Sequence, residues 1–166
     1  KDFVVGVAPA AADDAELVFL TREAQLLKFP AAVVRPQGRT AGGMAGIKLA
    51  AGDQVIFFGA VRPNDEAAVV VSIAGTNGAL PGTAPGTAKV TAFDEYPAKG
   101  RATAGVRAHR FLKGEDTLLL AWAGHGPAKA SSAAGAARSL PQEHGRRDGS
   151  GVPLSQAVEA VGPTMA

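Results

Sequence analysis

The sequence predicts an all-β, propeller-like fold built from about three repeated units. Three observations support this prediction: short apolar runs bounded by turn residues, a Gly-Arg segment that recurs along the chain, and few longer runs with helical spacing. With 166 residues, the chain is long enough for one domain with a hydrophobic core. Its 21 Gly and 11 Pro are typical of a β protein with many turns.

The first recurring element is an acidic residue followed by a short apolar run. It occurs at Asp2–Val7, at Asp53–Phe58 and at Asp116–Trp122, with spacings of 51 and 63 residues. Runs of this length that are rich in β-branched and aromatic residues favour strands. We therefore expect one strand at each of these three positions.

A pair of strand-like runs follows each of the first two acidic strands. The expected pairs are Leu17–Leu20 with Leu26–Phe29, and Ala68–Ile73 with Ala88–Phe93. Glu16–Phe29 also has the spacing of an amphipathic helix, but the repeat favours a hairpin for this segment. Asn77-Gly78 predicts a tight turn between two strands.

A Gly-Arg segment lies upstream of the second and third acidic strands and recurs once more. The copies are Gly38–Leu49, Gly100–Phe111 and Gly145–Val152, named here the first, second and third Gly-Arg loops. Their Gly-Arg pairs are 62 and then 45 residues apart, so Arg39, Arg101 and Arg146 are the expected equivalents. Four short strands per unit are typical of a propeller-like array. We expect repeats at 1–50, 51–113 and 114–166, with 131–166 as a degenerate blade or a loose tail.

Positive charge gathers around the Gly-Arg loops. The net charge is only +2, so a nucleic-acid surface has to come from local clustering. Equivalent positions of a circular array line one rim, which predicts a basic stripe suited to phosphate backbones. The expected phosphate contacts are Lys28, Arg35, Arg39, Lys48, Lys99, Arg101, Arg107, Arg110, Lys113, Arg146 and Arg147. The alternative is a solvated face that confers solubility. The aromatic fraction of 5% argues against single-strand binding by base stacking.

Catalytic and metal motifs are not found in the sequence. The absence of Cys excludes a disulfide scaffold, a thiolate zinc site and a cysteine nucleophile. Gly42–Gly46 has part of a dinucleotide-loop spacing, but it precedes a strand and favours a backbone bend. His109, His125 and His144 are 16 and 19 residues apart, which favours surface or rim positions over a metal site. We expect no catalytic residue, no metal and no membrane-spanning helix.

Three segments of the chain resemble a known family. Leu17–Arg22, Gln37–Asp53 and Gly100–Arg107 are similar to the C-terminal β-pinwheel domain in the A subunit of type IIA DNA topoisomerases, the GyrA and ParC family. The Ala- and Arg-rich composition is similar to that of actinobacterial members. The resemblance covers most of residues 1–125 and implies a five- or six-bladed pinwheel, of which about three repeats are present. It also implies that the catalytic tyrosine lies in another domain, and that Tyr96 is structural.

The resemblance implies a function without catalysis. Such domains bind and bend or wrap duplex DNA around a basic rim, without sequence specificity, as an accessory to strand passage by gyrase or topoisomerase IV. Gln37–Gly43 carries one positive charge where the gyrase box carries several, which favours the ParC side. The implied partners are double-stranded DNA, the ATPase B subunit, and the rest of the A subunit, in the nucleoid of the cytoplasm. No cofactor is expected for this domain, since ATP and Mg²⁺ serve other parts of the enzyme. The alternative is a protein-interaction module that does not bind DNA.

Overall fold

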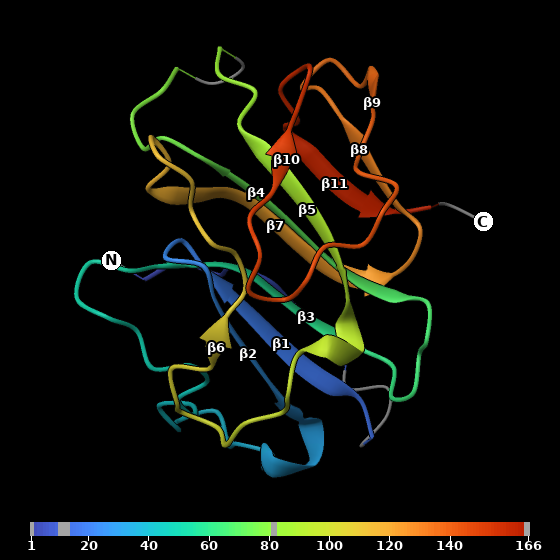
Figure 1. Ribbon diagram of the computed structural model, residues 1–166. Helices are drawn as coiled ribbons and strands as arrows, with labels where there is room; N and C mark the ends of the chain where they lie inside the picture. The colour runs from blue at the N-terminus through green and yellow to red at the C-terminus, as the bar shows by residue number, and fades with distance from the viewer. Residues whose placement is uncertain (1, 10–13, 81–82, 165–166) are drawn as a thin grey trace.

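The computed structural model describes residues 2–9, 14–80 and 83–164, and it is all-β (Figure 1). The ends of the expected repeats at residues 1 and 165–166 lie outside the described residues. The strands are β1 (Glu16–Thr21), β2 (Gln25–Pro30), β3 (Val55–Val61), β4 (Ala68–Gly75), β5 (Thr87–Ala92), β6 (Val106–Arg107), β7 (Thr117–His125), β8 (Ala128–Ser131), β9 (Ala137–Arg138), β10 (Val152–Pro153) and β11 (Ala160–Pro163). Two short 3₁₀ turns, η1 (Ala31–Val33) and η2 (Phe93–Glu95), follow β2 and β5.

The strands form three antiparallel sheets with one common order. The first sheet is β3-β1-β2-β6, the second is β7-β4-β5-β10, and the third is β11-β8-β9. In each, a hairpin is flanked on one side by a strand that comes later in the chain. On the other side, β6 of the second Gly-Arg loop flanks the first sheet, and β10 at the end of the third loop flanks the second sheet. This arrangement is the propeller-like repeat that the sequence predicts.

The sheets do not coincide with the expected repeats at 1–50, 51–113 and 114–166. The first sheet takes strands from residues 16 to 107, and the second from residues 68 to 153. Successive units therefore share strands and interlock. The physical reason is that pairing of the short β6 and β10 is non-local: each joins the hairpin of the preceding unit. A repeat in the sequence predicts the spacing of such strands along the chain but does not predict which strands they pair with.

Residues 16–30 form a hairpin, as predicted, and not a helix. Leu17 pairs with Phe29 and Phe19 with Leu27 across β1 and β2. The Phe19 ring stacks on Phe29 at 5.7 Å between centroids and packs on Phe58 of β3 at 4.9 Å. Such cross-strand aromatic contacts stabilise a sheet beyond the burial of their area.

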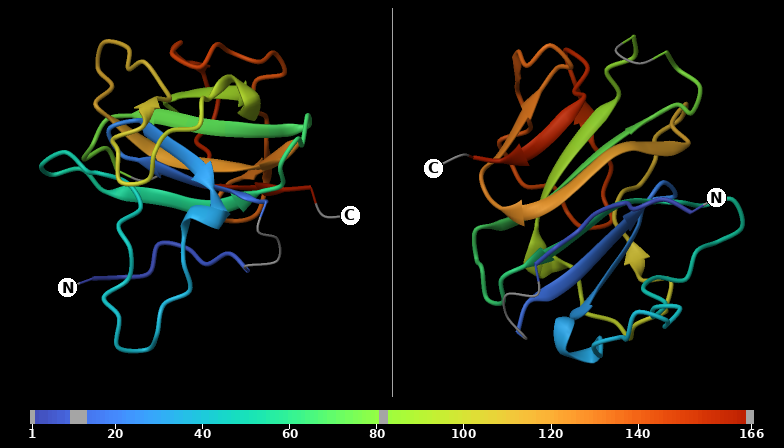
Figure 2. Two further views of the ribbon diagram at one scale, coloured as in Figure 1. Left: turned by 90° about the horizontal axis from the view of Figure 1, so that it is seen from below. Right: turned by 180° about the vertical axis from the view of Figure 1, so that it is seen from behind.

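β4 is the central strand of the molecule, and all eight of its residues are buried. One face, with Val70, packs toward the first sheet in a cluster that includes Leu20. The other face, with Val71, packs toward the third sheet in a cluster that includes Trp122 and Val158. Burial of each such side chain contributes about 1.5–3 kcal/mol. Burial on both faces explains why this segment reads as a continuous apolar run and not as an alternating one. Figure 2 shows the sheets one after another in a row.

The prediction for the chain start is wrong in the described residues. Asp2–Val7 is not a strand, and Phe3 and Val4 are 73% and 79% exposed. The segment passes close to β3, where a Cβ at Gly6 would lie 2.9 Å from the Phe58 carbonyl oxygen, but it forms no strand pairing there. Asn77-Gly78 does form the expected turn, although the connection continues to β5.

Residues 128–163 contain the short three-stranded sheet of β8, β9 and β11. Ala130 and Val158 cover one face of the second sheet. Among the described residues there is no helix long and apolar enough to cross a membrane.

Candidate nucleic-acid interface

The three Gly-Arg loops are joined in series by main-chain hydrogen bonds. The Lys48 N–H donates to the Thr103 carbonyl at 3.0 Å, which ties the first loop to the second. The Arg110 N–H donates to the Gly149 carbonyl at 3.0 Å, which ties the second loop to the third. The two donors are 62 residues apart and their acceptors are 46 residues apart. The same main-chain contact between successive loops, called here the loop crossing, therefore occurs twice. Figure 1 shows the first two loops side by side next to β6, and the third loop leading into β10.

A glycine lets each shared strand approach its sheet. Gly105 has a φ of +75°, and a Cβ there would overlap the Leu26 carbonyl of β2. Gly151 takes the same position before β10, where a Cβ would lie 2.7 Å from the Thr87 hydroxyl of β5. The recurrence of glycine in the loops therefore follows from close backbone packing as well as from the need for a positive φ.

Most of the predicted phosphate contacts are exposed. These are Arg35, Arg39, Lys48, Lys99, Arg107, Arg110, Lys113 and Arg146. They lie on or directly beside the three joined loops. The main-chain bonds between the loops bring together segments from distant parts of the sequence that carry these cations.

Lys28 differs from this set because it is buried. Its side chain is 8% exposed, and its ammonium pairs with the Glu16 carboxylate at 3.3 Å. The same ammonium lies 4.1 Å from the centre of the Phe93 ring. A cation that is buried and paired in this way stabilises the fold through its contacts with the protein. This placement argues against the predicted phosphate contact, and Lys28 is left out of the interface proposed below.

Arg101 and Arg147 are half-buried, and both bind protein carbonyls. Arg101 donates from Nη1 to the Ala45 carbonyl at 2.6 Å, and Arg147 donates from Nη1 to the Arg107 carbonyl at 3.4 Å. The strand registers place Val106 of β6 and Val152 of β10 at the same sheet position, 46 residues apart. The residue equivalent to Arg101 is therefore Arg147, and the expected assignment of Arg146 to this position is wrong by one residue.

Lys89 is a functional candidate that the sequence analysis missed. It is 2% exposed, and its ammonium donates to the carbonyls of Arg146, Arg147 and Gly149 at 2.9, 2.5 and 3.1 Å. Lys89 thereby binds the third Gly-Arg loop to strand β5 of the second sheet. Burial lowers its pKa to about 8, against the favourable charge of Asp148. A lysine inside the apolar run Ala88–Phe93 was the available signal, because a charge on a buried strand needs partners.

His109 is buried at 1% exposure, so the predicted surface or rim position is wrong. Its ring lies between the Ser72 hydroxyl, 2.8 Å from Nδ1, and the Gly151 N–H, which donates to Nε2 at 3.1 Å. Burial, with the charge of Lys89, lowers its pKa to about 4. His109 thus fixes the third loop against the second sheet in its neutral form. His125 and His144 are exposed, as predicted.

Tyr96 has the structural position that was expected. It is 1% exposed, and its hydroxyl donates to the Ala108 carbonyl at 3.4 Å. Burial raises its pKa to about 12. A covered phenol of this kind packs the second loop against the core.

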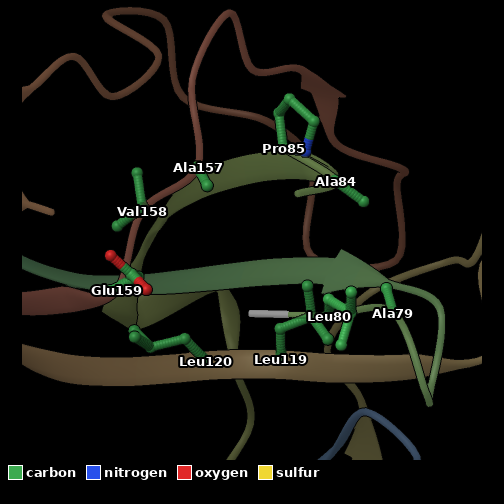
Figure 3. Close-up of a pocket in the computed structure, with 9 residues that line it drawn as sticks. All are labelled: Ala79, Leu80, Ala84, Pro85, Leu119, Leu120, Ala157, Val158 and Glu159. Atoms are coloured by element: carbon green, nitrogen blue, oxygen red, sulfur yellow. The ribbon is translucent and has the colours of Figure 1, made fainter. Parts of the chain in front are cut away.

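An apolar hollow lies apart from the loops, beside β7 (Figure 3). Leu80, Leu119 and Val158 form much of its wall, and Glu159 is its one charged side chain. The Glu159 carboxylate accepts the Ala133 N–H at 2.7 Å. The hollow carries no positive charge, so it does not extend the basic surface. Within residues 2–9, 14–80 and 83–164, no three acidic or histidine side chains gather as a metal site.

Interlocked four-stranded sheets that share strands through recurring loops define a β-propeller of the pinwheel type. A model of one family, the DNA gyrase C-terminal domain, beta-propeller, matches residues 15–62 and 83–119, which include the first two Gly-Arg loops. The chain belongs to this family. The family is a non-catalytic domain of a topoisomerase.

Relatives with this sequence pattern are components of topoisomerases. Topoisomerase subunit TopoM of Mycolicibacterium smegmatis is 45% identical over 107 residues, which are 63% of this chain and 13% of that protein. The DNA gyrase A subunit of Salmonella typhimurium is 37% identical over 105 residues, which are 63% of this chain and 10% of that protein. The chain therefore spans a small part of these relatives.

Two solved structures share the fold. The C-terminal domain of DNA topoisomerase IV aligns with a TM-score of 0.68 at 17% identity, over 90% of this chain and 46% of that one. The DNA gyrase A C-terminal domain aligns with a TM-score of 0.63 at 16% identity, over 96% of this chain and 57% of that one. The chain spans about half the length of each of these domains.

Proposed function

We propose that this domain binds duplex DNA without sequence specificity, along the joined Gly-Arg loops, as an accessory to strand passage by a type IIA topoisomerase. The single observation that carries the proposal is the repeated crossing of the loops, which presents exposed cations at equivalent positions. Lys48 and Arg110 mark the two crossings. Cations on such a scaffold bind phosphates and read no bases, because the part of the chain that the structure describes has no helix that could enter a groove.

The proposed DNA surface consists of the exposed cations alone. These are Arg35, Arg39, Lys48, Lys99, Arg107, Arg110, Lys113 and Arg146. Acidic groups intrude at the third loop, where Glu95 accepts the Arg147 N–H at 2.9 Å. The first two loops therefore supply most of the attraction. A duplex that follows successive loops bends, and bending of a site of about 20–30 base pairs costs on the order of 1–6 kcal/mol.

The proposed setting follows from the family. The names of the relatives support a place within a topoisomerase subunit, such as the A subunit of DNA gyrase. The partners proposed for this setting are DNA and an ATPase B subunit, in the cytoplasm. In this setting the domain positions DNA and uses no cofactor of its own. Other parts of the enzyme supply the chemistry.

A titration of this chain against linear duplex and single-stranded DNA at several salt concentrations tests the proposal. If about six cations contact phosphates, the logarithm of the duplex binding constant falls with the logarithm of the salt concentration at a slope of about −5. Single-stranded DNA should bind more weakly, since few aromatic residues are available for stacking. Absence of duplex binding at low salt would refute DNA binding by this chain and favour a protein-interaction module.

A further inference from the structure

Two arginines make the same contact between successive Gly-Arg loops. Arg101 of the second loop donates to the Ala45 carbonyl of the first, and Arg147 of the third loop donates to the Arg107 carbonyl of the second. The donors are 46 residues apart and the acceptors 62 apart. These are the spacings that relate the strands of successive units. Because the contact recurs at the spacing of the repeat, it is a regular part of the way in which one Gly-Arg loop packs against the next.

The arginine contact lies beside the main-chain bonds of the same crossing. Around Arg101, the Lys48 N–H donates to Thr103 and the Ala102 N–H donates to the Gly46 carbonyl at 2.6 Å. A guanidinium offers several donors in a planar fork, which holds a carbonyl at a fixed distance and direction. One side chain and two backbone bonds thus determine how far apart the two loops lie.

We propose that Arg101 and Arg147 are positioning residues that set the spacing of the Gly-Arg loops, and so place the exposed cations of those loops for phosphates. The inference rests on the proposed function for its DNA part, and on the loop geometry alone for its positioning part. It reassigns two residues that the sequence predicts as direct phosphate contacts.

Arg39 is the matched control. It takes the equivalent position in the first loop and is exposed, and the described residues hold no hydrogen bond from its side chain. Removal of Arg39 removes the same charge from the same kind of loop without loss of a loop-to-loop contact. Arg39→Ala should therefore behave as the loss of one phosphate contact, with a salt slope shallower by about 0.9.

The first experiment is amide hydrogen exchange on the chain without DNA. Arg101→Ala should speed exchange of the Lys48 and Ala102 amides about tenfold, the effect of losing one hydrogen bond from a charged donor. Arg39→Ala should leave both amides unchanged. The amide of the buried Leu118, which donates to the Arg22 carbonyl, reports whether each variant is still folded. Unchanged exchange at Lys48 and Ala102 in a folded Arg101→Ala variant would overturn the positioning role.

The same exchange measurement applies to the second crossing. Arg147→Ala should speed exchange of the Arg110 amide, which donates to Gly149. If Arg101→Ala fails to fold, this variant decides the question. An Arg110 amide that exchanges at the wild-type rate would then count against the proposal.

The second experiment is a double-variant cycle with duplex DNA. If Arg101 acts by holding the loop that carries Lys48, the losses in DNA binding free energy caused by Arg101→Ala and Lys48→Ala are not additive, and the double variant loses less than their sum. When each single change weakens binding about tenfold, the double variant should lose well under about a hundredfold. A full product of the two losses would mean that Arg101 is an independent phosphate contact, which would overturn the inference. Failure of the wild-type chain to bind DNA would refute the proposed function and the DNA part of this inference, while the exchange result would still decide the positioning role.

Discussion

Acidification should destabilise the fold through His109. The Gly151 N–H donates to Nε2, so Nε2 is an acceptor and the ring proton is assigned to Nδ1, which faces the Ser72 hydroxyl. Protonation of Nε2 would break the bond to Gly151 and place a charge in a site that is 1% exposed. The positive charge of Lys89 opposes it further, and the carboxylate of Glu115 only partly offsets this.

The sign and size of the effect follow from linkage. Burial lowers the pKa of His109 from 6.5 to about 4, so the unfolded chain takes up a proton at a higher pH than the folded chain does. The stability that neutral His109 provides is therefore complete above about pH 6.5, and is lost as the pH falls toward 4. A shift of this size corresponds to about 3 kcal/mol over the full interval.

The assay is urea unfolding at pH 7, 5.5 and 4 for the wild type and for His109→Gln. The difference in unfolding free energy between the two should shrink by about 3 kcal/mol from pH 7 to pH 4, because the variant lacks the titrating ring. His144→Gln, at an exposed position, should keep the pH dependence of the wild type. An unchanged difference between wild type and His109→Gln across this range would refute the reasoning.

Three further predictions test the packing of the loops. Gly105→Ala should destabilise the fold by about 2 kcal/mol or more in urea unfolding, because strain at positive φ adds to an overlap with the Leu26 carbonyl. The control Gly114→Ala, at positive φ in open space, should cost about 1 kcal/mol. Equal costs for the two variants would contradict the shared-strand packing. Tyr96→Phe loses one long hydrogen bond and should cost under about 1 kcal/mol with an unchanged DNA salt slope, and a large loss of DNA binding would argue against a structural role. Because burial lowers the pKa of Lys89 from 10.5 to about 8, the Lys89 ammonium of the unfolded chain keeps its proton to higher pH than that of the folded chain. The free energy of unfolding should therefore rise between about pH 8 and 10.5, and Lys89→Met should abolish that rise. A rise that persists in the variant would assign it to another group.

The fold class and the loops were predictable from sequence because they rest on local signals. Apolar runs of strand length and the recurring Gly-Arg segments need only the spacing of residues along the chain. The hairpin at 16–30 also followed, since the repeat outweighed a helical spacing. The same local signals failed at Asp2–Val7, which lies close to Phe58 of β3 but does not pair with it as a strand.

The parts that sequence did not predict depend on contacts between distant segments. The sharing of β6 and β10 between units is a matter of register, and one residue of register separates Arg146 from the true equivalent, Arg147. The sequence predicts Lys28 as a phosphate contact, and only the apolar run around Lys89 signals its burial, yet both ammonium groups are enclosed by partners 12 to 65 residues away. Formal charge alone does not tell whether a cation serves the fold or a ligand.

The central claim is that cations of the joined Gly-Arg loops, and not the overall charge, bind duplex DNA. The most direct measurement compares two triple variants in a salt titration. Arg39, Lys48 and Arg110 change to Ala in the first, and three exposed cations outside the loops, Arg22, Arg62 and Lys129, change to Ala in the second. The account predicts a salt slope shallower by about 3 in the loop variant and a slope near that of the wild type in the other. Equal slopes for the two variants would contradict it.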